Sequence, residues 1–323
     1  MMENLKEVFK GKKKISLVIP MYYEEKVAEE CYRRVKENLD KLTDNYNYEI
    51  IFVNDGSKDK TLSILEEIAS KDKNVKIISF SRNFGHQAAV TAGLQYVTGD
   101  AIIIMDADLQ DPPELIPDML KLWEDGNEVI YGKRKSREGE SAFKLLTAKM
   151  FYKTLNSLSE VEIPKDTGDF RLVDRKVVDT INSLPEHNKF LRGLFSWVGY
   201  KQKEYLYERK ERFAGETKYP LKKMIKLAKD GIFSFSTKPI RFIGLFGGIF
   251  IFISFVLLLF IIIYNSINEI NLSIFWNILM VLNFMQGVQL IITWILGEYI
   301  GRIYDESKNR PQYIIDKKIN IEK

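Results

Sequence analysis

The sequence predicts an α/β fold with a mostly parallel sheet covered by helices on both faces, followed by a membrane-associated region. Three observations support this prediction. Short β-rich apolar runs alternate with longer amphipathic stretches up to about residue 134, a basic and aromatic stretch covers 209–241, and two long uncharged segments come after it. Regular alternation of strands and helices is typical of parallel sheets, because parallel neighbours need a crossover connection.

Five strands are expected in the first part of the chain, at 15–20, 49–55, 75–81, 101–106 and 128–134. Helical segments are expected between them, near 24–42, 58–71, 86–97 and 113–125. In such sheets ligands bind beyond the carboxyl ends of the strands. Four polar clusters fall there, namely "PMYYEE", "NDGS", "SRNFGHQ" and "DADLQ". This edge of the sheet is therefore the expected ligand site.

Beyond residue 134 the pattern changes. "GESAFKLLTAKMFYKTLNSL" predicts a long helix, and "TGDFRLVDRKV" predicts a further strand that leads into a helix. We expect a catalytic domain over 1–208 and basic amphipathic helices in the lipid headgroup layer over 209–241. Two transmembrane helices are expected within 242–299, and a C-terminal tail over 300–323.

The two expected spans are the uncharged stretches 242–264 and 270–297. Each exceeds the roughly 20 residues that a helix needs to cross a bilayer. Glu269 is the single charge between them, whereas basic residues flank the pair: Lys238, Arg241, Arg302, Lys308 and Arg310. By the positive-inside tendency the catalytic domain and both termini face the cytosol. The expected location is the inner (cytoplasmic) membrane.

Composition adds further expectations. The first apolar run, "ISLVIPMY", is too short for a signal peptide, and the lone Cys31 fits a reducing compartment. A net charge of +4 gives no indication of nucleic-acid binding. The glycines at 244, 247 and 248 suggest close helix packing and a homo-oligomer.

An unusual group of carboxylates closes the fourth expected strand. "IIIMDADLQDPPE" places Asp106, Asp108 and Asp111 directly after a buried apolar run. Their mutual repulsion is relieved if a divalent cation lies between them. Asp106, Asp108 and Gln110 alternate, so their side chains share one face if the strand continues. Hard oxygen ligands of this kind suit Mg²⁺ or Mn²⁺.

Taken in order, the motifs resemble a known family. "SLVIPMYYEE", "FVNDGSKDKT", "FSRNFGHQAA", "DADLQDPPE", "TGDFRLVDRKVV", "RFAGETKY" and "GEYIGRIYDESKNRP" are similar to family 2 glycosyltransferases of the Rossmann-like GT-A fold. The likeness is strongest to membrane-bound polyprenyl-phosphate glycosyltransferases, both the GtrB-type undecaprenyl-phosphate glucosyltransferases and dolichol-phosphate mannose synthase. It covers nearly the whole chain. One departure is Tyr23, which stands where the family usually has asparagine.

The resemblance implies roles for particular residues. Asp108 and Gln110 would hold Mg²⁺ or Mn²⁺, with Asp106 shared between the metal and the ribose. The nucleotide sugar would contact residues at the strand ends: Pro20, Tyr22, Glu24, Asp55, Arg82 and Asn83. Asp169 would orient groups or accept a proton at the reaction centre. Arg134, Arg212 and Lys218 are candidates for gripping the acceptor phosphate, with Thr217 donating a hydrogen bond.

Simpler interpretations stay open for two of these motifs. Asp55, Gly56 and Ser57 could form only a turn and a helix cap. His86 at the start of a helix is structural or adjacent to the diphosphate rather than a base. With His187 as the only other histidine, the sequence predicts no histidine metal site.

The expected activity is that of an inverting, metal-dependent hexosyltransferase. It would move glucose from UDP-glucose onto undecaprenyl phosphate at the cytosolic face of the membrane. UDP-N-acetylhexosamine and GDP-mannose are alternative donors, because relatives that use them share these motifs. A processive polysaccharide synthase is disfavoured by the absence of a Gln-x-x-Arg-Trp motif. A non-catalytic scaffold that binds a nucleotide sugar is the alternative from another class.

Overall fold

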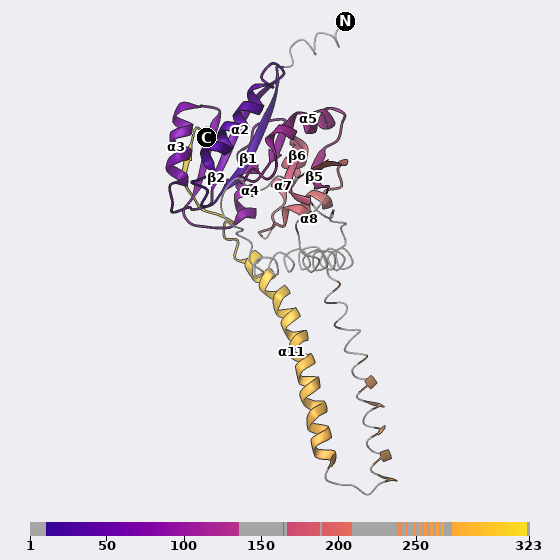
Figure 1. The fold of residues 1–323 in the computed structure, drawn as a ribbon. Helices are drawn as coiled ribbons and strands as arrows, with labels where there is room; N and C mark the ends of the chain where they lie inside the picture. The colour runs from indigo at the N-terminus through magenta and orange to yellow at the C-terminus, as the bar shows by residue number, and fades with distance from the viewer. Residues whose placement is uncertain are drawn as a thin grey trace.

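The structure is a computed structural model that describes residues 11–135, 164, 167–187, 189–208, scattered positions between 238 and 267, and 273–321. An α/β unit forms one end of the molecule, and the long helix α11 (Ser273–Ser307) runs toward it from the far end (Figure 1). The chain after α11 joins the α/β unit, because its last strand belongs to the same sheet as the first.

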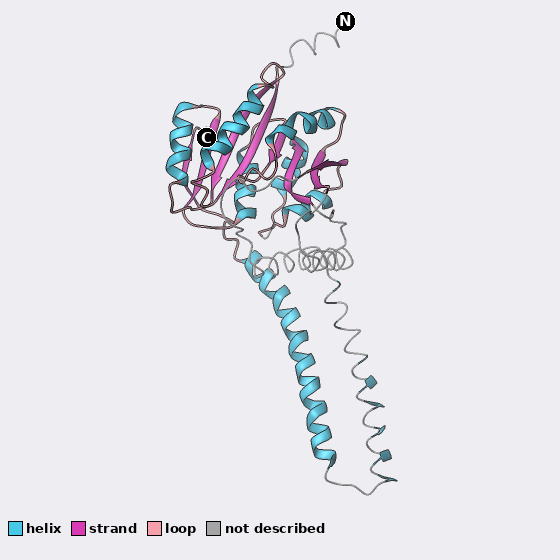
Figure 2. Ribbon diagram, in the orientation of Figure 1, coloured by secondary structure: helices cyan, strands magenta, loops and turns pink. Residues whose placement is uncertain are grey.

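The α/β unit is built on an 8-stranded sheet with the order β7-β5-β6-β4-β1-β2-β3-β8 (Figure 2). Strands β1 to β4 are mutually parallel, and among the described strands only β6 and β8 run against the rest. The strands are β1 (Lys13–Met21), β2 (Tyr46–Asn54), β3 (Val75–Phe80), β4 (Ala101–Ile104), β5 (Val129–Arg134), β6 (Thr167–Asp174), β7 (Gln202–Tyr207) and β8 (Ile315–Ile319). The predicted mostly parallel sheet is confirmed.

Helices cover both faces of this sheet, as predicted. Alternate strand residues point to opposite sides, so Leu17 and Ile19 lie in one apolar cluster while Val18 lies in the other. The first cluster includes residues of α2 (Ala28–Asp40), α3 (Thr61–Lys71) and α5 (Ile116–Glu124), which follows the short helix η1 (Pro113–Leu115). The second includes residues of α4 (His86–Tyr96), α7 (Arg175–Ser183) and α8 (Leu191–Trp197).

The expected elements agree with the structure up to small differences at their ends. The five predicted strands are β1 to β5, and "TGDFRLVDRKV" forms the predicted strand β6 and helix α7. Strand β4 ends at Ile104, two residues before its predicted end, because the chain turns at 107–110 and Leu109 has a positive φ of 58°. Strands β7 and β8 were not predicted. Both lie at sheet edges, and each contains consecutive charged residues ("QKEYLY" and "IDKKI") in place of a continuous apolar run, so the sequence gives little signal for a strand.

Several predictions fall outside the described residues. These are the long helix in 139–158, the basic helices of 209–237, and the glycines at 244, 247 and 248 proposed for helix packing. Most of the first expected span, 242–264, is likewise not described. In the part of the chain that the structure describes, no helix is both long and apolar enough to span a membrane.

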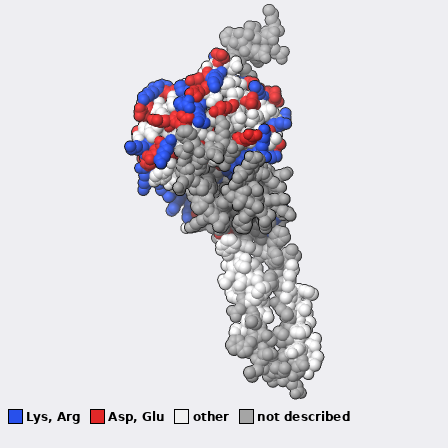
Figure 3. All heavy atoms as spheres, viewed as in Figure 1, with Lys and Arg blue, Asp and Glu red and all other residues white. Residues whose placement is uncertain are grey.

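Helix α11 differs from the α/β unit in the side chains that it exposes. Charged side chains cover the α/β unit, whereas the described part of α11 remote from it shows none (Figure 3). Large apolar residues along α11 are exposed, among them Leu282, Phe284, Leu290, Ile291 and Trp294 at 53–63%. Such a surface needs an apolar environment or partner.

The buried carboxylate of Glu49 connects neighbouring strands near the end of the sheet that lies opposite the expected ligand site. Glu49 is 1% exposed, and it accepts hydrogen bonds from Lys14 (2.8 Å), Ser16 (2.6 Å) and the backbone N–H of Thr98 (2.6 Å). Lys76 pairs with it at 2.7 Å. Burial alone raises the pKa of Glu49, but the hydrogen bonds from Lys14, Lys76 and Ser16 outweigh burial and lower it to about 2.

This lowered pKa predicts an acid-sensitive contribution to stability. Because the folded-state pKa of about 2 lies below the unfolded value of 4.5, the stabilisation is fully present above pH 4.5 and is lost as the pH falls toward 2. Urea unfolding should show that the wild type loses about 2 kcal/mol more than Glu49→Gln between pH 7 and pH 3. The exposed Glu37→Gln is the control and should follow the wild type. Parallel pH profiles for wild type and Glu49→Gln would contradict this role.

Candidate functional site

The residues predicted to bind a nucleotide sugar lie at one edge of the sheet. Pro20 is near the end of β1, and Tyr22 and Glu24 follow that strand; Asp55 follows β2, and Arg82 and Asn83 follow β3. Strands β1, β2 and β3 are parallel neighbours, so their carboxyl ends meet at this edge. The predicted grouping of these residues in space is confirmed. Their contacts with a ligand stay a prediction.

Asp55 organises the loop that follows β3. Its carboxylate accepts hydrogen bonds from the side chain of Asn83 (2.7 Å) and from the backbone N–H groups of Phe84 (2.7 Å) and Gly85 (3.0 Å). Burial raises the pKa of Asp55, and the two backbone donors partly offset this rise. The alternative role as a helix cap is wrong, because α3 begins only at Thr61, whose N–H is bound by Asp59.

Gly56 allows the loops after β2 and β3 to approach each other closely. Its φ is +66°, and a Cβ built at this position would lie 2.3 Å from the backbone carbonyl carbon of Arg82. The predicted turn is therefore present, and glycine is required by both its φ value and the contact with Arg82. This approach brings Asp55 within reach of the Phe84 amide.

Tyr23, the one departure from the expected motif, has an unusual backbone conformation. Tyr23 has a φ of 53°, in the left-handed region that asparagine tolerates better than a bulky residue. Its N–H donates to Ser57 at 3.0 Å, and its ring is 41% exposed. Tyr22 is less exposed, and burial, Tyr23 and Asp55 together raise the pKa of its hydroxyl. The substitution therefore places backbone strain next to the expected base-binding residues.

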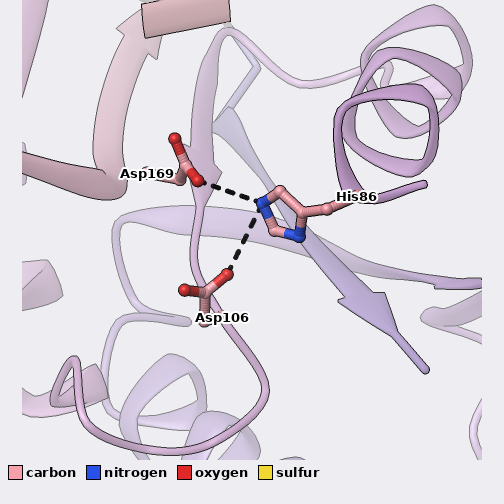
Figure 4. Close-up of side chains that lie close together, drawn as sticks. All are labelled: His86, Asp106 and Asp169. Carbon is pink, nitrogen blue, oxygen red and sulfur yellow. Dashed lines mark hydrogen bonds and ion pairs between the residues drawn. The ribbon is translucent and has the colours of Figure 1, made fainter. Parts of the chain in front are cut away.

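A second group of charged side chains forms where α4, β4, β6 and α8 meet. Nε2 of His86 lies 3.1 Å from a carboxylate oxygen of Asp169 and 3.7 Å from one of Asp106 (Figure 4). Arg192 donates two hydrogen bonds to Asp169, at 2.7 and 3.0 Å. The group thus contains two carboxylates held by an imidazole and a guanidinium.

The pKa values in this group follow from its mixture of burial and charge. Burial lowers the pKa of His86, but the hydrogen bond to Asp169 and the charges of Asp106 and Asp169 raise it to about 9. Burial raises the pKa of Asp169, yet Arg192 and His86 hold it well below its usual value. Burial and the carboxylates Asp169, Asp111 and Asp108 raise the pKa of Asp106, against the opposing effect of His86. Asp169 is therefore charged near neutral pH, whereas the pKa of Asp106 stays raised although His86 lies 3.7 Å from it.

His86, Asp106 and Asp169 are also placed so that they could hold a metal ion. Among the described histidine, cysteine, aspartate and glutamate residues, they form the one group with three ligand atoms within 4.8 Å of one another. The sequence predicted no histidine metal site, and the structure gathers one histidine with two carboxylates. Although burial lowers the pKa of this imidazole, Asp169 and Asp106 raise it, so a metal ion at this position would have to displace the imidazole proton.

The predicted metal ligands occupy a turn rather than a strand. We expected Asp106, Asp108 and Gln110 to share a face if β4 continued, but β4 ends at Ile104, so strand alternation does not place these side chains. Asp108 is buried, and its carboxylate accepts a hydrogen bond from the N–H of Gln110 at 3.2 Å. The positive φ of Leu109 reverses the chain between them. The assignment of these residues as metal ligands stays a prediction, now based on a turn.

Arg134 lies near the same group, at the end of β5. A Cβ built on Gly168 would lie 3.3 Å from the guanidinium of Arg134. Because Gly168 directly precedes Asp169, Arg134 lies close to that carboxylate in the fold. The Nε atom of Arg134 is buried and has no hydrogen-bond partner among the described residues. Nearby, the hydroxyl of Tyr207 donates to the buried Asp111. Arg212, Thr217 and Lys218, the other predicted acceptor ligands, lie outside the described residues.

Two residues of this site were missed in the sequence. His86 was assigned a structural or diphosphate-adjacent role, although it directly follows a polar cluster at the ligand edge. Arg192 was not singled out at all, because it lies in "FLRGLF" with no polar neighbours that would indicate a site. Only the packing of α8 against β6 brings its guanidinium to Asp169.

Comparisons with known proteins give consistent findings. A profile of the family described as Glycosyl transferase family 2 matches residues 16–181. The uncharacterized glycosyltransferase YkcC of Bacillus subtilis (strain 168) is 51% identical over 308 residues, covering 95% of this chain and 94% of the relative. The bactoprenol glucosyl transferase of Shigella phage SfII is 44% identical over 314 residues, covering 94% and 98%.

A solved structure is also similar, at low identity. It is glucosyl-3-phosphoglycerate synthase from Mycobacterium tuberculosis in complex with Mn²⁺, UDP-glucose and phosphoglyceric acid. It shares 19% sequence identity with this chain, and the match covers 72% of this chain and 82% of that one with a TM-score of 0.46.

Proposed function

Because the chain belongs to glycosyl transferase family 2, we propose that it transfers a hexose from a nucleotide sugar to a polyprenyl phosphate. The observation that carries this proposal is the carboxylate group Asp106 and Asp169 at the ligand edge of the sheet. The bactoprenol glucosyl transferases, at 44% identity over almost the whole chain, support glucose as the sugar and undecaprenyl (bactoprenyl) phosphate as the acceptor. UDP-glucose is the proposed donor.

The nucleotide part of the donor would lie along the strand ends. Asp55, with Tyr22 and Glu24 beside it, offers acceptors for base N–H groups or ribose hydroxyls. Arg82 is exposed next to this position and offers a cation for the diphosphate. Asn83 contacts Asp55 directly and would hold that carboxylate in place.

A divalent cation fits the site on the chemistry of its donors. The pKa of Asp106 is raised by burial and by three neighbouring carboxylates, so added positive charge there would be stabilising. Asp106, Asp108 and Gln110 supply the oxygen ligands that Mg²⁺ and Mn²⁺ prefer. When bound, the ion would offset the charge that develops on the leaving diphosphate.

Asp169 is proposed to orient groups rather than to accept a proton. The acceptor is a phosphate that is already ionised at neutral pH, so it needs positioning and charge screening more than a base. The lowered pKa of Asp169 makes this carboxylate a weak base. Its contacts with His86 and Arg192 fix two cationic side chains beside the reacting groups. Arg134, together with Arg212, Thr217 and Lys218, would bind the acceptor phosphate.

Attack by the acceptor oxygen opposite the leaving diphosphate would invert the anomeric carbon in one displacement. The bond from that carbon to the diphosphate breaks as the bond to the lipid phosphate forms. No covalent sugar-enzyme intermediate is required.

The decisive experiment uses the full-length protein in membranes with undecaprenyl phosphate and a panel of radiolabelled UDP-glucose, UDP-N-acetylhexosamine and GDP-mannose. We expect labelled lipid from UDP-glucose and loss of this product when EDTA is added. Labelled lipid from another donor would change the sugar but keep the reaction class. Nucleotide binding without any lipid product from the panel would favour the non-catalytic scaffold.

The catalytic unit is proposed to work at the cytosolic face of the inner membrane. The acceptor keeps its tail in the bilayer, and the exposed apolar side chains of α11 support contact between this helix and lipid. Cysteine labelling of intact cells tests the topology in a Cys31→Ser background, where Asn268→Cys should react from outside and Ser307→Cys should not. The reverse pattern would separate the site from its cytosolic donor and contradict the proposed location.

Asp108→Ala tests the metal assignment. Loss of one carboxylate ligand should lower the transfer rate by at least about 100-fold, the effect expected for a major electrostatic stabiliser of the transition state. The rate should be measured at several Mg²⁺ and Mn²⁺ concentrations, together with the thermal unfolding of the variant. The exposed Asp118→Asn, in α5, is the control and should keep wild-type metal dependence. A variant with more than about one tenth of wild-type activity and unchanged metal dependence would contradict Asp108 as a ligand.

A further inference from the structure

The last turn of α11 and the segment that follows it contact both loops that position the site carboxylates. The side chain of Glu306 accepts a hydrogen bond from the N–H of His187 at 2.9 Å, in the loop that leads to Arg192. The C=O of Ile314 accepts one from the N–H of Ser81 at 3.1 Å, at the start of the loop that holds Asp55. These contacts join residues that are more than 100 positions apart in the sequence.

Within this segment, Tyr313 begins a series of ring contacts that ends at the donor site. Its ring stacks on Phe80, with centroids 4.9 Å apart and an interplanar angle of 14°. Phe80 in turn contacts the ring of Phe84 edge to face, at 5.7 Å. The guanidinium of Arg82 lies over the ring of Phe84, 4.5 Å from its centroid. The hydroxyl of Tyr313 also donates a hydrogen bond to Gln95 in α4.

Phe84 is the point where this series meets the backbone of the site. Its N–H donates to Asp55 at 2.7 Å, while its ring supports Arg82. Phe80 is only 3% exposed, so it has little room to move unless Tyr313 moves as well. A shift of Phe80 would therefore displace the Phe84 ring and amide together, and with them Arg82 and the hydrogen bond to Asp55.

We propose that Tyr313 is a positioning residue for the donor site, which acts through Phe80 and Phe84 on Arg82 and Asp55. This inference rests on the proposed function, which assigns the loop 81–85 to the nucleotide sugar. It also gives the end of α11 a role in the site, because Tyr313 follows the last residue of that helix, Ser307, by only a few positions. The C-terminal segment then aligns the donor loop as well as closing the edge of the sheet.

Hydrogen exchange tests the coupling without requiring activity. In Tyr313→Ala, the amides of Phe84 and Gly85 should exchange about two- to tenfold faster than in the wild type, as expected for the loss of one aromatic contact. The core amides of β1 should keep their wild-type rates. Tyr313→Phe retains the ring and should behave like the wild type. Lys317→Ala, which removes an exposed ion pair between β8 and Glu66 of α3, is the matched control and should also leave the loop unchanged.

Steady-state kinetics with the same variants gives a second readout. Tyr313→Ala should raise the KM for UDP-glucose about two- to tenfold, with the KM for undecaprenyl phosphate unchanged. Unchanged exchange at Phe84 and Gly85, or equal acceleration in the loop and in β1, would overturn the proposal. If the wild type uses no nucleotide sugar at all, the proposed function fails, and the exchange rates still decide whether Tyr313 positions this loop.

Discussion

Replacing Asp169 by asparagine should lower the rate of hexose transfer at saturating substrates by at least about 100-fold. Asparagine keeps the size of the side chain but removes the charge that holds His86 at 3.1 Å and Arg192 at 2.7 Å. Both cations would then be partly buried without their main counter-ion, and neither would keep its orientation. The rate should be measured with UDP-glucose and undecaprenyl phosphate, and UDP binding should be measured in parallel to show that the variant is folded.

A matched control separates this effect from a general loss of charge. Asp179 lies in α7, where its side chain is 62% exposed and pairs with Arg175 at 3.7 Å. Asp179→Asn should keep the rate within about twofold, since exposed ion pairs contribute little. Arg192→Lys offers a second check, because lysine keeps the charge but cannot form the paired hydrogen bonds to Asp169. An Asp169→Asn variant that retains more than about one tenth of the wild-type rate would remove this carboxylate from the proposed site.

The substitution Gly56→Ala should destabilise the fold by about 3 kcal/mol or more. An alanine here must adopt a φ of +66°, and its Cβ would lie 2.3 Å from the backbone of Arg82. Neither strand end can move freely, because β2 and β3 are paired from Ile50 to Asn54 of β2, up to the residue before Asp55. Urea unfolding of the variant should show a lower midpoint with an unchanged slope.

Gly126 provides the control for this prediction. It also has a positive φ, of +84°, but a Cβ there would meet nothing within 4 Å. Gly126→Ala should therefore show only the backbone term, about 1–2 kcal/mol. The excess destabilisation in Gly56→Ala then measures the close approach of the two loops. Equal losses in the two variants would show that Arg82 moves away at little cost, and the loop would not be rigidly placed.

Much of the fold could be predicted because its signals are local. The runs that form β1 to β4 are largely apolar, as is typical of strands buried on both faces, and polar residues follow each of them. Since these strands are parallel, the polar residues had to collect at one edge. This reasoning predicts from the sequence alone that one edge of the sheet carries Asp55, Arg82, Asn83 and Asp106.

Strand β8 could not be predicted, for a physical reason. "IDKKI" is short and highly charged, and it is stable as a strand only because β3 supplies hydrogen-bond partners from the other end of the chain. The same holds for Tyr313, whose position beside Phe80 depends on that pairing. A residue of this kind has no local pattern that would indicate its role.

The sequence by itself determined the alternation of strands and helices, the edge of the sheet at which polar residues collect, and the excess of carboxylates at that edge. These follow from residue type and order, because apolar periodicity and strand polarity are properties of short segments. Only the tertiary structure decided that Asp169 is held by His86 and Arg192, that Asp55 anchors the loop after β3 instead of capping a helix, and that Tyr313 reaches the donor loop. Each of these depends on distances between segments far apart in the chain, and such distances are set by packing and pairing rather than by local sequence.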